Sequence, residues 1–401
     1  MPLRVAVVGA GLGGLAAAMF LRARGIAAEV YERDAVFREV GAGIVVAPNM
    51  IRPLQRLGIA AGLENFAVRL DHAWEFRRWL DGEVIASTPM HEACERLYGA
   101  PCYVAHRADL RAFFGAQLPE GAVHLDRRCT GVTEAGDGLR LDFVSADSRV
   151  HRVEADAVIA ADGIRSALRD AMTRPEAPRF SGLCAYRCLV PAERAPQMAL
   201  RPAHTLWLGP GRHFVHYPIS AGRLVNVVAI TPAGEWRSES WTAKGEIAEL
   251  MAEFGGWDPR VRLLIARATQ TTRWAIFDRA PLERWTSGRI ALMGDAAHAM
   301  LPFLAQGAAQ CVEDAETLAA CLADAGPATV AEGLRRYETL RRPRANAVLL
   351  GSRGREVSNH LPDGPEQQAR DVRLAAIDPL QQIAWLYGET EAERTLLAAK
   401  R

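Results

Sequence analysis

Residues 4–15 read RVAVVGAGLGGL, and this stretch decides the fold of the amino-terminal part of the chain. It predicts a buried strand, a glycine turn and the start of a helix. Gly9, Gly11 and Gly14 have the G-x-G-x-x-G spacing of a dinucleotide-binding turn. In such a turn the first glycine permits the tight bend, the second lets the backbone approach a pyrophosphate, and the third lets helix and strand pack closely. We therefore predict a nucleotide phosphate site at the start of this helix.

A second apolar strand follows the helix and ends in an acidic residue. The helix is predicted to end at Gly25, and residues 28–31 read AEVY before Glu32. Glu32 falls at about the distance expected for an acid that binds a ribose hydroxyl. Turn, strand and acid in register favour a nucleotide site over a merely structural glycine turn.

The composition limits the number of domains and the kinds of partner that the chain can have. The chain has 401 residues, 49% of them hydrophobic, which is enough for a large core and for two or three domains or one composite fold. The formal net charge of +1 gives no support for a nucleic-acid or anionic-membrane surface. No apolar run is long enough to predict a membrane span. The seven cysteines are scattered, which predicts free thiols in the cytoplasm and no metal site.

A second motif, at Asp162, and a candidate arginine, Arg107, each follow a strand in the first half of the chain. Residues 122–160 alternate as a small sheet, with 123–125 as its first strand, and the buried strand 157–161 ends in Asp162. Asp162 is placed to accept hydrogen bonds from ribose or ribityl hydroxyls, although a helix cap is the alternative. Arg107 lies where strand 103–106 turns into a helix, so that it either reaches a cofactor or is simply exposed.

Residues 175–280 are rich in strands and predict a sheet suited to cover a ligand. In the strand 212–219, alternation puts His213, Val215 and Tyr217 on one face and Phe214 and His216 on the other. One face thus presents an imidazole and a phenol together, unless both are ordinary half-exposed sheet residues. Residues 70–100 also read as strands and not helices.

The third motif lies near the end of the globular part. Strand 289–293 runs into GDAAH at 294–298, then LPFLAQGAA at 301–309 and a helix to about residue 323. On that helix Glu313, Asp314 and Glu316 are expected to complement the helix dipole and not to act as a catalytic carboxylate pair. The remainder of the chain predicts mostly helix.

The three motifs in this order resemble the single-component FAD-dependent aromatic hydroxylases, especially the salicylate hydroxylase, 3-hydroxybenzoate 6-hydroxylase and 6-hydroxynicotinate 3-monooxygenase group. The resemblance covers nearly the whole chain. It implies an α/β fold with a Rossmann-like, GR2-type FAD-binding domain, an interleaved β-sheet substrate domain and C-terminal helices. The expected limits are 1–70, 100–175 and 281–340 for the FAD-binding domain, 71–99 and 176–280 for the substrate domain, and 341–401 for the helical segment.

The resemblance also implies where FAD is held. The glycine turn and Glu32 hold its AMP half, Asp295 holds the ribityl-phosphate portion, and a positive helix end stabilises the negative charge of the reduced flavin. The implied cofactor contacts are Gly9, Gly11, Gly14, Glu32, Arg33, Val45, Arg107, Asp162, Asp295, Gly307 and Ala308.

The reaction implied by the resemblance is hydroxylation of a small phenolic or hydroxylated aromatic acid. NADH or NADPH reduces FAD, and O2 then forms a flavin C4a-hydroperoxide that delivers OH to the ring. His213 is expected to act as the base or to orient the phenol, Tyr217 to hydrogen-bond the substrate, and Pro302 to lie beside the flavin. Val46 and Leu304 replace polar residues of the hydroxynicotinate enzymes, which favours a benzene ring over a pyridine ring.

Two alternatives keep the fold but change the function. The chain could act as a heteroaromatic or natural-product hydroxylase, an epoxidase or an oxidative decarboxylase. It could also be a non-catalytic FAD-fold binding protein, like the Rab-GDP dissociation inhibitors, but a scaffold has no need of the motifs at Asp162 and Asp295. We expect a monomer or homodimer with a small aromatic substrate, O2 and NAD(P)H as its partners.

Overall fold

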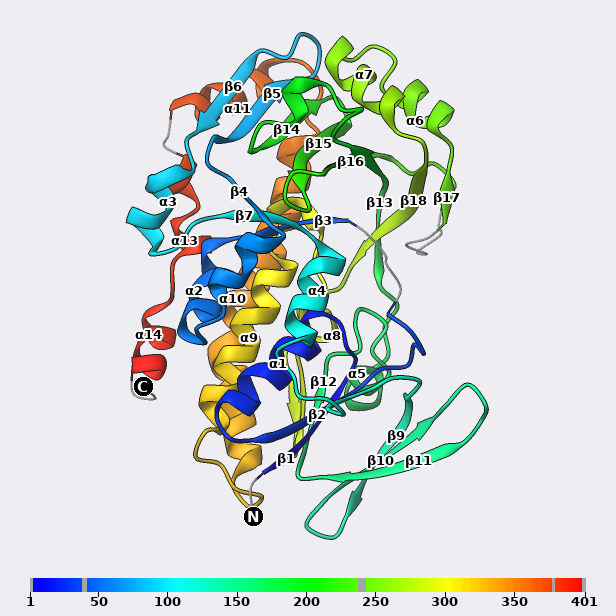
Figure 1. The fold of residues 1–401 in the computed structure, drawn as a ribbon, viewed down its shortest axis with the longest axis vertical. Helices are drawn as coiled ribbons and strands as arrows, with labels where there is room; N and C mark the ends of the chain where they lie inside the picture. Colours follow the sequence, from blue (N-terminus) through cyan, green and yellow to red (C-terminus); the bar gives the residue numbers. More distant parts are fainter. Residues whose placement is uncertain (1–2, 38–41, 237–242, 377–378, 399–401) are drawn as a thin grey trace.

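The computed structural model describes residues 3–37, 42–236, 243–376 and 379–398, and two large sheets lie at opposite ends of a pair of long helices (Figure 1). The lower sheet in Figure 1 is built around the amino-terminal strand. From edge to edge its strands are β19 (Thr286–Ser287), β20 (Ile290–Leu292), β12 (Ala157–Ala160), β1 (Arg4–Val8), β2 (Ala27–Tyr31) and β8 (Val123–His124). All neighbours from β20 to β8 are parallel, whereas β19 is antiparallel. This parallel sheet confirms the predicted Rossmann-like fold.

The first helix is buried because its side chains are small and apolar on most sides. Helix α1 (Leu12–Ala23) contacts both the parallel sheet and helix α9 (Gly307–Leu322). Ala16, Ala17 and Ala18 are fully buried between them. A helix that is apolar all round belongs in a core, and this one fixes the glycine turn beside the start of α9.

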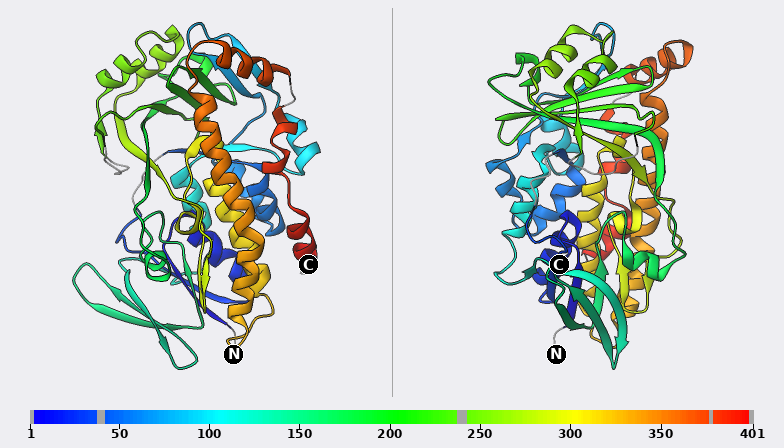
Figure 2. Two further views of the ribbon diagram at one scale, coloured as in Figure 1. Left: turned by 180° about the vertical axis from the view of Figure 1, so that it is seen from behind. Right: turned by 90° about the vertical axis from the view of Figure 1, so that its right-hand side faces the viewer.

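The upper sheet joins strands from two distant parts of the sequence (Figure 2). From edge to edge these are β17 (Lys244–Gly245), β18 (Thr271–Asp278), β13 (Arg179–Pro191), β16 (Leu224–Pro232), β15 (Arg212–Ile219), β14 (Ala203–Gly209), β5 (Ala73–Arg78) and β6 (Val84–Thr88). Helices α6 (Ile247–Glu253) and α7 (Pro259–Arg267) pack on its outer face, where Leu250 and Leu264 join Phe214 and Trp207 in one apolar cluster.

The remaining strands form two small antiparallel sheets, and this part of the structure differs from two expectations. The first contains β3 (Gly43–Val46), β7 (Tyr103–His106) and β4 (Val68–Arg69); the second contains β9 (Arg128–Ala135), β10 (Gly138–Val144) and β11 (Val150–Ala155). Residues 123–125 were expected in the second sheet, but β8 pairs with β2 at the edge of the Rossmann-like sheet. Residues 91–98 form a helix and not a strand, because Cys94 and Tyr98, four residues apart, are buried together.

The remaining helices support the sheets and reach both ends of the molecule. Helix α10 runs beside α9 from the lower sheet to the upper one (Figures 1 and 2). The helices whose bounds have not yet been given are α2 (Pro48–Arg56), α3 (His91–Tyr98), α4 (Arg107–Gly115), α5 (Ala167–Met172), α8 (Asp295–His298), α10 (Val330–Asn359), α11 (Pro365–Ala376), α12 (Pro379–Gln382), α13 (Ala384–Tyr387) and α14 (Glu391–Ala398). Short 3-10 turns are η1 (Ala60–Asn65), η2 (Gln197–Ala199) and η3 (Pro302–Leu304).

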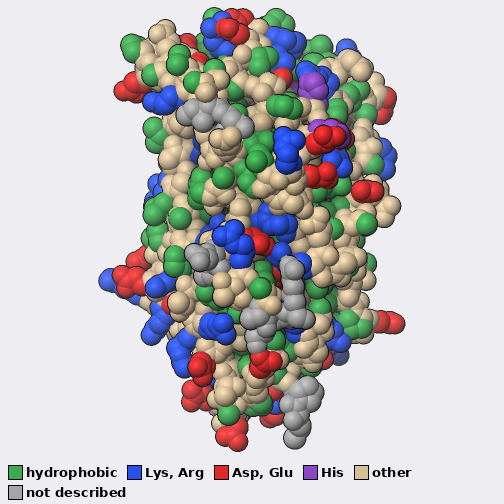
Figure 3. Space-filling model, turned by 90° about the vertical axis from the view of Figure 1, so that its left-hand side faces the viewer, with side chains coloured by type: hydrophobic (Ala, Val, Ile, Leu, Met, Phe, Trp, Pro, Cys, Tyr) green, Lys and Arg blue, Asp and Glu red, His purple; other side chains and the backbone are tan. Residues whose placement is uncertain are grey.

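The outer surface matches the balanced composition. On the face drawn in Figure 3, Lys and Arg side chains are interspersed with Asp and Glu side chains and do not form one continuous basic area. Among the described residues, no helix is long and apolar enough to cross a membrane.

Candidate active site

A cavity of about 350 Å³ lies between the glycine turn, the start of α9 and the inner face of the eight-stranded sheet. This volume falls within the range of small-ligand pockets. Nine of the residues predicted from sequence line it. They are Gly11, Val45, Arg107, His213, Tyr217, Asp295, Pro302, Gly307 and Ala308.

The glycine turn is fixed by contacts that leave no room for a side chain at two of its three glycines, Gly9 and Gly14. A Cβ at Gly9, where φ is 103°, would lie 2.5 Å from the carbonyl oxygen of Ala161. A Cβ at Gly14 would lie 1.8 Å from the carbonyl oxygen of Gly9. A Cβ at Gly11 would meet nothing within 4 Å, and Gly11 lines the cavity. The turn therefore needs two glycines for packing, whereas the third leaves its backbone open to a ligand.

The acid after β2 holds the glycine turn from behind. The backbone N–H of Ala10 donates to Glu32 Oε2 at 2.7 Å, and that of Asp34 donates to Glu32 Oε1 at 3.0 Å. Arg33 is exposed and lies 4.0 Å from the carboxylate of Asp34. Neither Glu32 nor Arg33 lines the cavity, so both stay predictions as cofactor contacts.

Asp162 supports the start of α5, whose N-cap is Ser166, and its role toward a ligand stays a prediction. Its Oδ2 accepts from the backbone N–H of Ala167, the first residue of α5, at 3.0 Å. Its Oδ1 is buried without a hydrogen-bond partner among the described residues. Burial raises the pKa of this carboxyl. Asp162 does not line the cavity, although its neighbour Gly163 does, and the free oxygen suits a ligand hydroxyl.

The third motif brings a short turn and a helix start to the same cavity. At Gly294, φ is 57°, and a Cβ there would lie 2.8 Å from Cys311 Sγ of α9. Asp295 begins α8 and Pro302 begins η3. A Cβ at Gly307, the first residue of α9, would meet nothing within 4 Å. The first N–H groups of α9 thus lie beside open space and favour negative charge there.

The other two predicted cofactor contacts come from the small sheet beside the cavity. Val45 belongs to β3, and Arg107 begins α4 directly after β7. Strand β3 covers residues 43–46, and residues 38–41 lie outside the described residues. The N–H of Gly43 donates to Asn226 Oδ1 at 2.7 Å. This bond ties the cofactor side of the cavity to the eight-stranded sheet.

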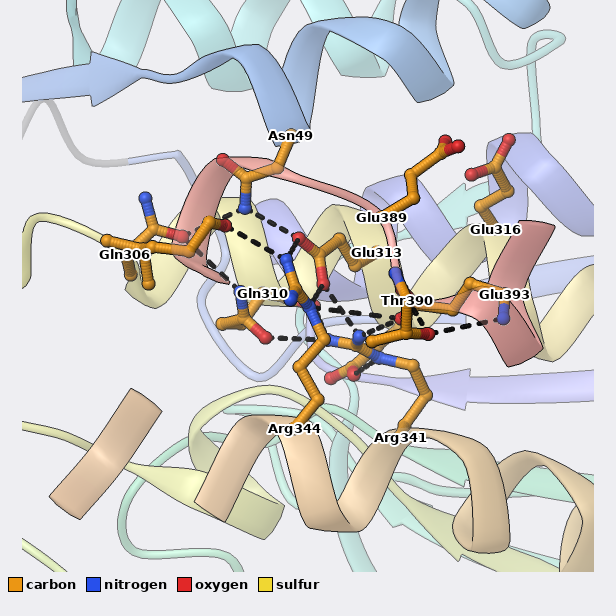
Figure 4. Close-up of polar contacts among 12 residues, drawn as sticks. Asn49, Gln306, Gln310, Glu313, Glu316, Arg341, Arg344, Glu389, Thr390 and Glu393 are labelled. Atoms are coloured by element: carbon orange, nitrogen blue, oxygen red, sulfur yellow. Dashed lines mark hydrogen bonds and ion pairs between the residues drawn. The ribbon is translucent and has the colours of Figure 1, made fainter. Parts of the chain in front are cut away.

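The acids of α9 do more than complement a dipole. Arg341 is fully buried, and its Nε donates to Asp314 at 2.9 Å. Its Nη1 donates to Glu313 and Glu393, each at 2.6 Å (Figure 4). Asn49 joins this ionic cluster by donating to Glu313 at 2.6 Å and to Gln306 at 2.9 Å. The cluster therefore holds the start of α9 against α2, α10 and α14.

The inner face of the eight-stranded sheet forms the opposite wall. His213, Val215 and Tyr217 line the cavity, whereas Phe214 packs on the outer face against Phe254. The ring of His204 lies between those of Trp74 and Tyr217, at centroid distances of 4.0 Å and 4.8 Å. This wall is aromatic, as a flat ring requires.

His213 is paired with a second histidine. Its Nδ1 lies 2.7 Å from Nε2 of His360, the cap residue directly after α10, and Phe303 contacts the imidazole ring edge-on. Burial, and then the neighbouring His360, lower the pKa of His213 well below its ordinary value. His213 is thus neutral near pH 7, and it accepts hydrogen bonds more readily than it holds a proton.

Three residues of this wall were not predicted from sequence. Arg187 of β13 lines the cavity, and its guanidinium lies 3.9 Å from the ring centroid of Trp274. Burial lowers its pKa to about 9. An arginine inside the apolar run LCAYRCLV at 183–190 was the available signal for it. His204 stands out as a polar residue before LWL, but His360 gives no local signal because its partner lies 147 residues away.

The residues around the glycine end are suited to FAD. Two open backbone positions, at Gly11 and Gly307, flank the cavity, and a Cβ at either would occupy that space. Arg107 lines the cavity, and its guanidinium can donate to a polar chain there; Asp162, whose Oδ1 has no partner among the described residues, directly precedes Gly163, which lines the cavity.

Comparisons with known proteins agree with this geometry. Residues 2–352 match the family described as FAD binding domain. The chain is 45% identical to a 3-amino-4-hydroxybenzoate 2-monooxygenase of Streptomyces platensis, over 96% of each chain. It is 35% identical to the 6-hydroxynicotinate 3-monooxygenase of Pseudomonas fluorescens, over 86% of this chain and 89% of the relative. A salicylate hydroxylase substrate complex superposes with a TM-score of 0.82 at 29% identity, covering 100% of this chain and 98% of the other.

Family, relatives and fold agree on one class of enzyme. The relatives are aromatic-ring monooxygenases, and their similarity covers 96% and 86% of this chain. This chain uses FAD, with NAD(P)H as co-substrate, and the non-catalytic alternative is set aside. The chain therefore belongs to the FAD binding domain family and is a flavoprotein monooxygenase of the aromatic hydroxylase type.

Proposed function

We propose that the chain hydroxylates an aminohydroxybenzoate, with 3-amino-4-hydroxybenzoate as the first compound to test. The relatives at 44–45% identity that act on this acid support the proposal. The observation that carries it is the sheet wall of the cavity, where a half-buried guanidinium, Arg187, and a buried, neutral imidazole, His213, face one aromatic-lined space. A ring with a carboxylate at one end and hydrogen-bond donors at the other complements that wall.

The roles of the residues follow from this placement. Arg187 binds the carboxylate, the Trp74–His204–Tyr217 stack lies along the ring, and His213 accepts a hydrogen bond from a ring substituent. When bound, FAD supplies the transfer of electrons from NAD(P)H and the activation of O2. Gly11, Asp295 and Gly307 are the residues proposed to hold it, and the apolar wall excludes water from the reacting ring.

The position of the new hydroxyl changes what His213 has to do. Carbon 2 of 3-amino-4-hydroxybenzoate is adjacent to the carbon bearing the amine and meta to the one bearing the hydroxyl. The amine lone pair, and not a phenolate, then activates the reacting carbon. An uncharged acceptor such as His213 keeps that amine neutral and oriented, which replaces the expected role of a base for the phenol.

A substrate panel tests the proposal. We would compare 3-amino-4-hydroxybenzoate, 3-hydroxybenzoate, salicylate, 6-hydroxynicotinate and the uncharged 3-amino-4-hydroxybenzamide, and measure NADH and NADPH oxidation together with product. We expect coupled hydroxylation of 3-amino-4-hydroxybenzoate and little hydroxylation of 3-amino-4-hydroxybenzamide. Coupled turnover of 6-hydroxynicotinate alone would instead support the heteroaromatic alternative.

We also propose a cytoplasmic location and a monomer or homodimer. The seven cysteines are free, which is typical of a reducing compartment that also supplies NAD(P)H. Native mass measurement tests the oligomeric state, and fractionation of the source cells tests the location.

A further inference from the structure

The end of the longest helix reaches the substrate wall of the cavity. Helix α10 ends at Asn359, and His360 follows it as the cap residue. The carbonyl oxygen of His360 accepts from the N–H of Gly211, in the hairpin between β14 and β15, at 3.1 Å. The His360 ring stacks on His213 at a centroid distance of 4.8 Å, and Phe303 meets it edge-on. His360 is thus held by backbone on one side and by two rings on the other.

The hydrogen bonds of the two imidazoles form a chain with one direction. His360 caps the C-terminal end of α10, where the last backbone carbonyls have no helical partner, and the carbonyl of Glu356 acts on its ring to raise the pKa against the larger effect of burial. Its Nε2 lies 2.7 Å from Nδ1 of His213. A carbonyl only accepts, and the nitrogen of His360 that serves it must be Nδ1, because Nε2 faces His213. A neutral imidazole has one N–H, so the Nε2 of His360 carries a lone pair.

The direction of these hydrogen bonds also sets the tautomer of His213. Since Nε2 of His360 accepts, Nδ1 of His213 must donate, which leaves its Nε2 as the acceptor. Burial keeps both rings neutral at neutral pH, with the pKa of His360 lowered to about 4. His213 lines the cavity, so its remaining nitrogen is the one that can serve a ligand.

We infer that His360 is a positioning residue that locks His213 in its Nδ1–H tautomer and makes Nε2 a hydrogen-bond acceptor for an N–H or O–H group of the substrate. The tautomer is inferred from the place of His360 at the carbonyl end of α10 and from its contact with His213, whereas its use in turnover rests on the proposed function. Without the acceptor at His360, His213 can adopt the other tautomer, present an N–H to the ring and lose the bond to the amine.

The tautomer can be observed without turnover. Long-range 1H–15N spectra of histidine-labelled holoenzyme distinguish Nδ1–H from Nε2–H, and His213→Gln assigns the signal by its loss. We expect Nδ1–H for His213 in the substrate-free enzyme and the loss of that pure state in His360→Phe. An Nε2–H signal for His213 in the unaltered enzyme would overturn the inference, whatever the substrate proves to be.

Activity then tests the consequence. We expect His360→Phe to lower the fraction of NAD(P)H oxidation coupled to product at least tenfold, with FAD affinity unchanged. His360→Gln offers a carbonyl acceptor and should recover both the tautomer and part of the coupling; it also serves if the Phe variant fails to fold. His91→Gln, on the outside of the molecule, is the control. Full coupling in a folded His360→Phe variant with altered tautomer would remove the functional role, and failure of every substrate would count against the proposed substrate class while leaving the tautomer result to stand.

Discussion

The two ends of the cavity differ in what lines them, since one is lined mostly by backbone and the other by side chains. At the glycine end the wall is mostly backbone, and a Cβ at Gly9 or Gly14 would lie within 2.5 Å of a carbonyl oxygen. At the sheet end the wall consists of side chains on alternate strand positions, among them Arg187, His204 and His213. Backbone walls tolerate few substitutions, whereas side chains on a fixed sheet can change without moving it. We infer that the glycine end serves a constant cofactor and that specificity lies at the sheet end.

The largest expected effect concerns the support behind the glycine end. Arg341→Met leaves the buried carboxylates of Glu313, Asp314 and Glu393 without their shared cation, which should lower the free energy of unfolding by about 3–5 kcal/mol. Arg342→Met, on the same helix but more exposed, should cost less than about 0.5 kcal/mol. Urea unfolding measures both. Equal losses in the two variants would mean that the ionic cluster does not hold α9.

The glycine turn can separate packing from cofactor binding. Gly14→Ala places a Cβ 1.8 Å from the Gly9 carbonyl oxygen and should cost about 1–3 kcal/mol of stability. Gly11→Ala meets no protein atom within 4 Å, so the fold should survive. Its methyl group occupies the ligand side and should weaken FAD binding about tenfold or more, equivalent to 1.4 kcal/mol. Thermal melting and flavin titration test the pair, and unchanged FAD affinity in folded Gly11→Ala would contradict this assignment of the turn.

At the sheet end, Arg187 tests specificity. Arg187→Met removes charge-assisted hydrogen bonds to a carboxylate worth about 1.5–3 kcal/mol, so KM for the acid should rise about 10–100-fold. Arg187→Lys keeps the charge and should lose less. Binding of the uncharged benzamide should be unaffected by either change. An equal loss for acid and amide would show that Arg187 shapes the wall without binding the carboxylate.

The smallest effect concerns pH and the histidines of the sheet. Burial, and then Arg77, lower the pKa of His216 to about 3. Its ordinary pKa is about 6.5, so the unfolded chain binds the proton first; the stability is full above pH 6.5 and falls as the pH drops toward 3. The loss at pH 5.5 is about 1.4 kcal/mol for this histidine.

His216→Phe should remove that part of the pH dependence. Urea midpoints at pH 7.5 and 5.5 measure it, with the exposed His91→Phe as control. Asp314, whose pKa is lowered to about 2 by His298 and Arg341 against the effect of burial, contributes only below about pH 4 and does not interfere. An unchanged difference between the two pH values in His216→Phe would contradict the buried neutral state of this ring.

The sequence predicted what depends on local patterns. The spacing of Gly9, Gly11 and Gly14 and the alternation along 212–219 predicted a turn and a strand face that the structure contains. These patterns work because a tight turn and a pleated strand are set by neighbouring residues. The parallel sheet and the family resemblance are confirmed as well.

What could not be predicted depends on contacts between distant residues. The pairing of His213 with His360 and the burial of Glu313 by Arg341 join segments with no shared local signal. The helical acids were therefore interpreted from the dipole alone, although their charges are neutralised inside the protein. Likewise β8 lies at the edge of the Rossmann-like sheet, where Val123 pairs with Val30. The alternation of residues along a strand does not reveal which strand it pairs with.

We propose that the glycine end of the cavity holds FAD and that the sheet end holds an aromatic acid beside it, where the O2 activated by FAD reacts with the ring. Turnover of 3-amino-4-hydroxybenzoate by the FAD-loaded enzyme under 18O2, followed by mass spectrometry, tests it most directly. We predict that each product molecule carries one labelled oxygen atom and that about one NAD(P)H is consumed per product. Consumption of NAD(P)H with release of hydrogen peroxide and no labelled product, for this acid and for every other member of the panel, would contradict the account.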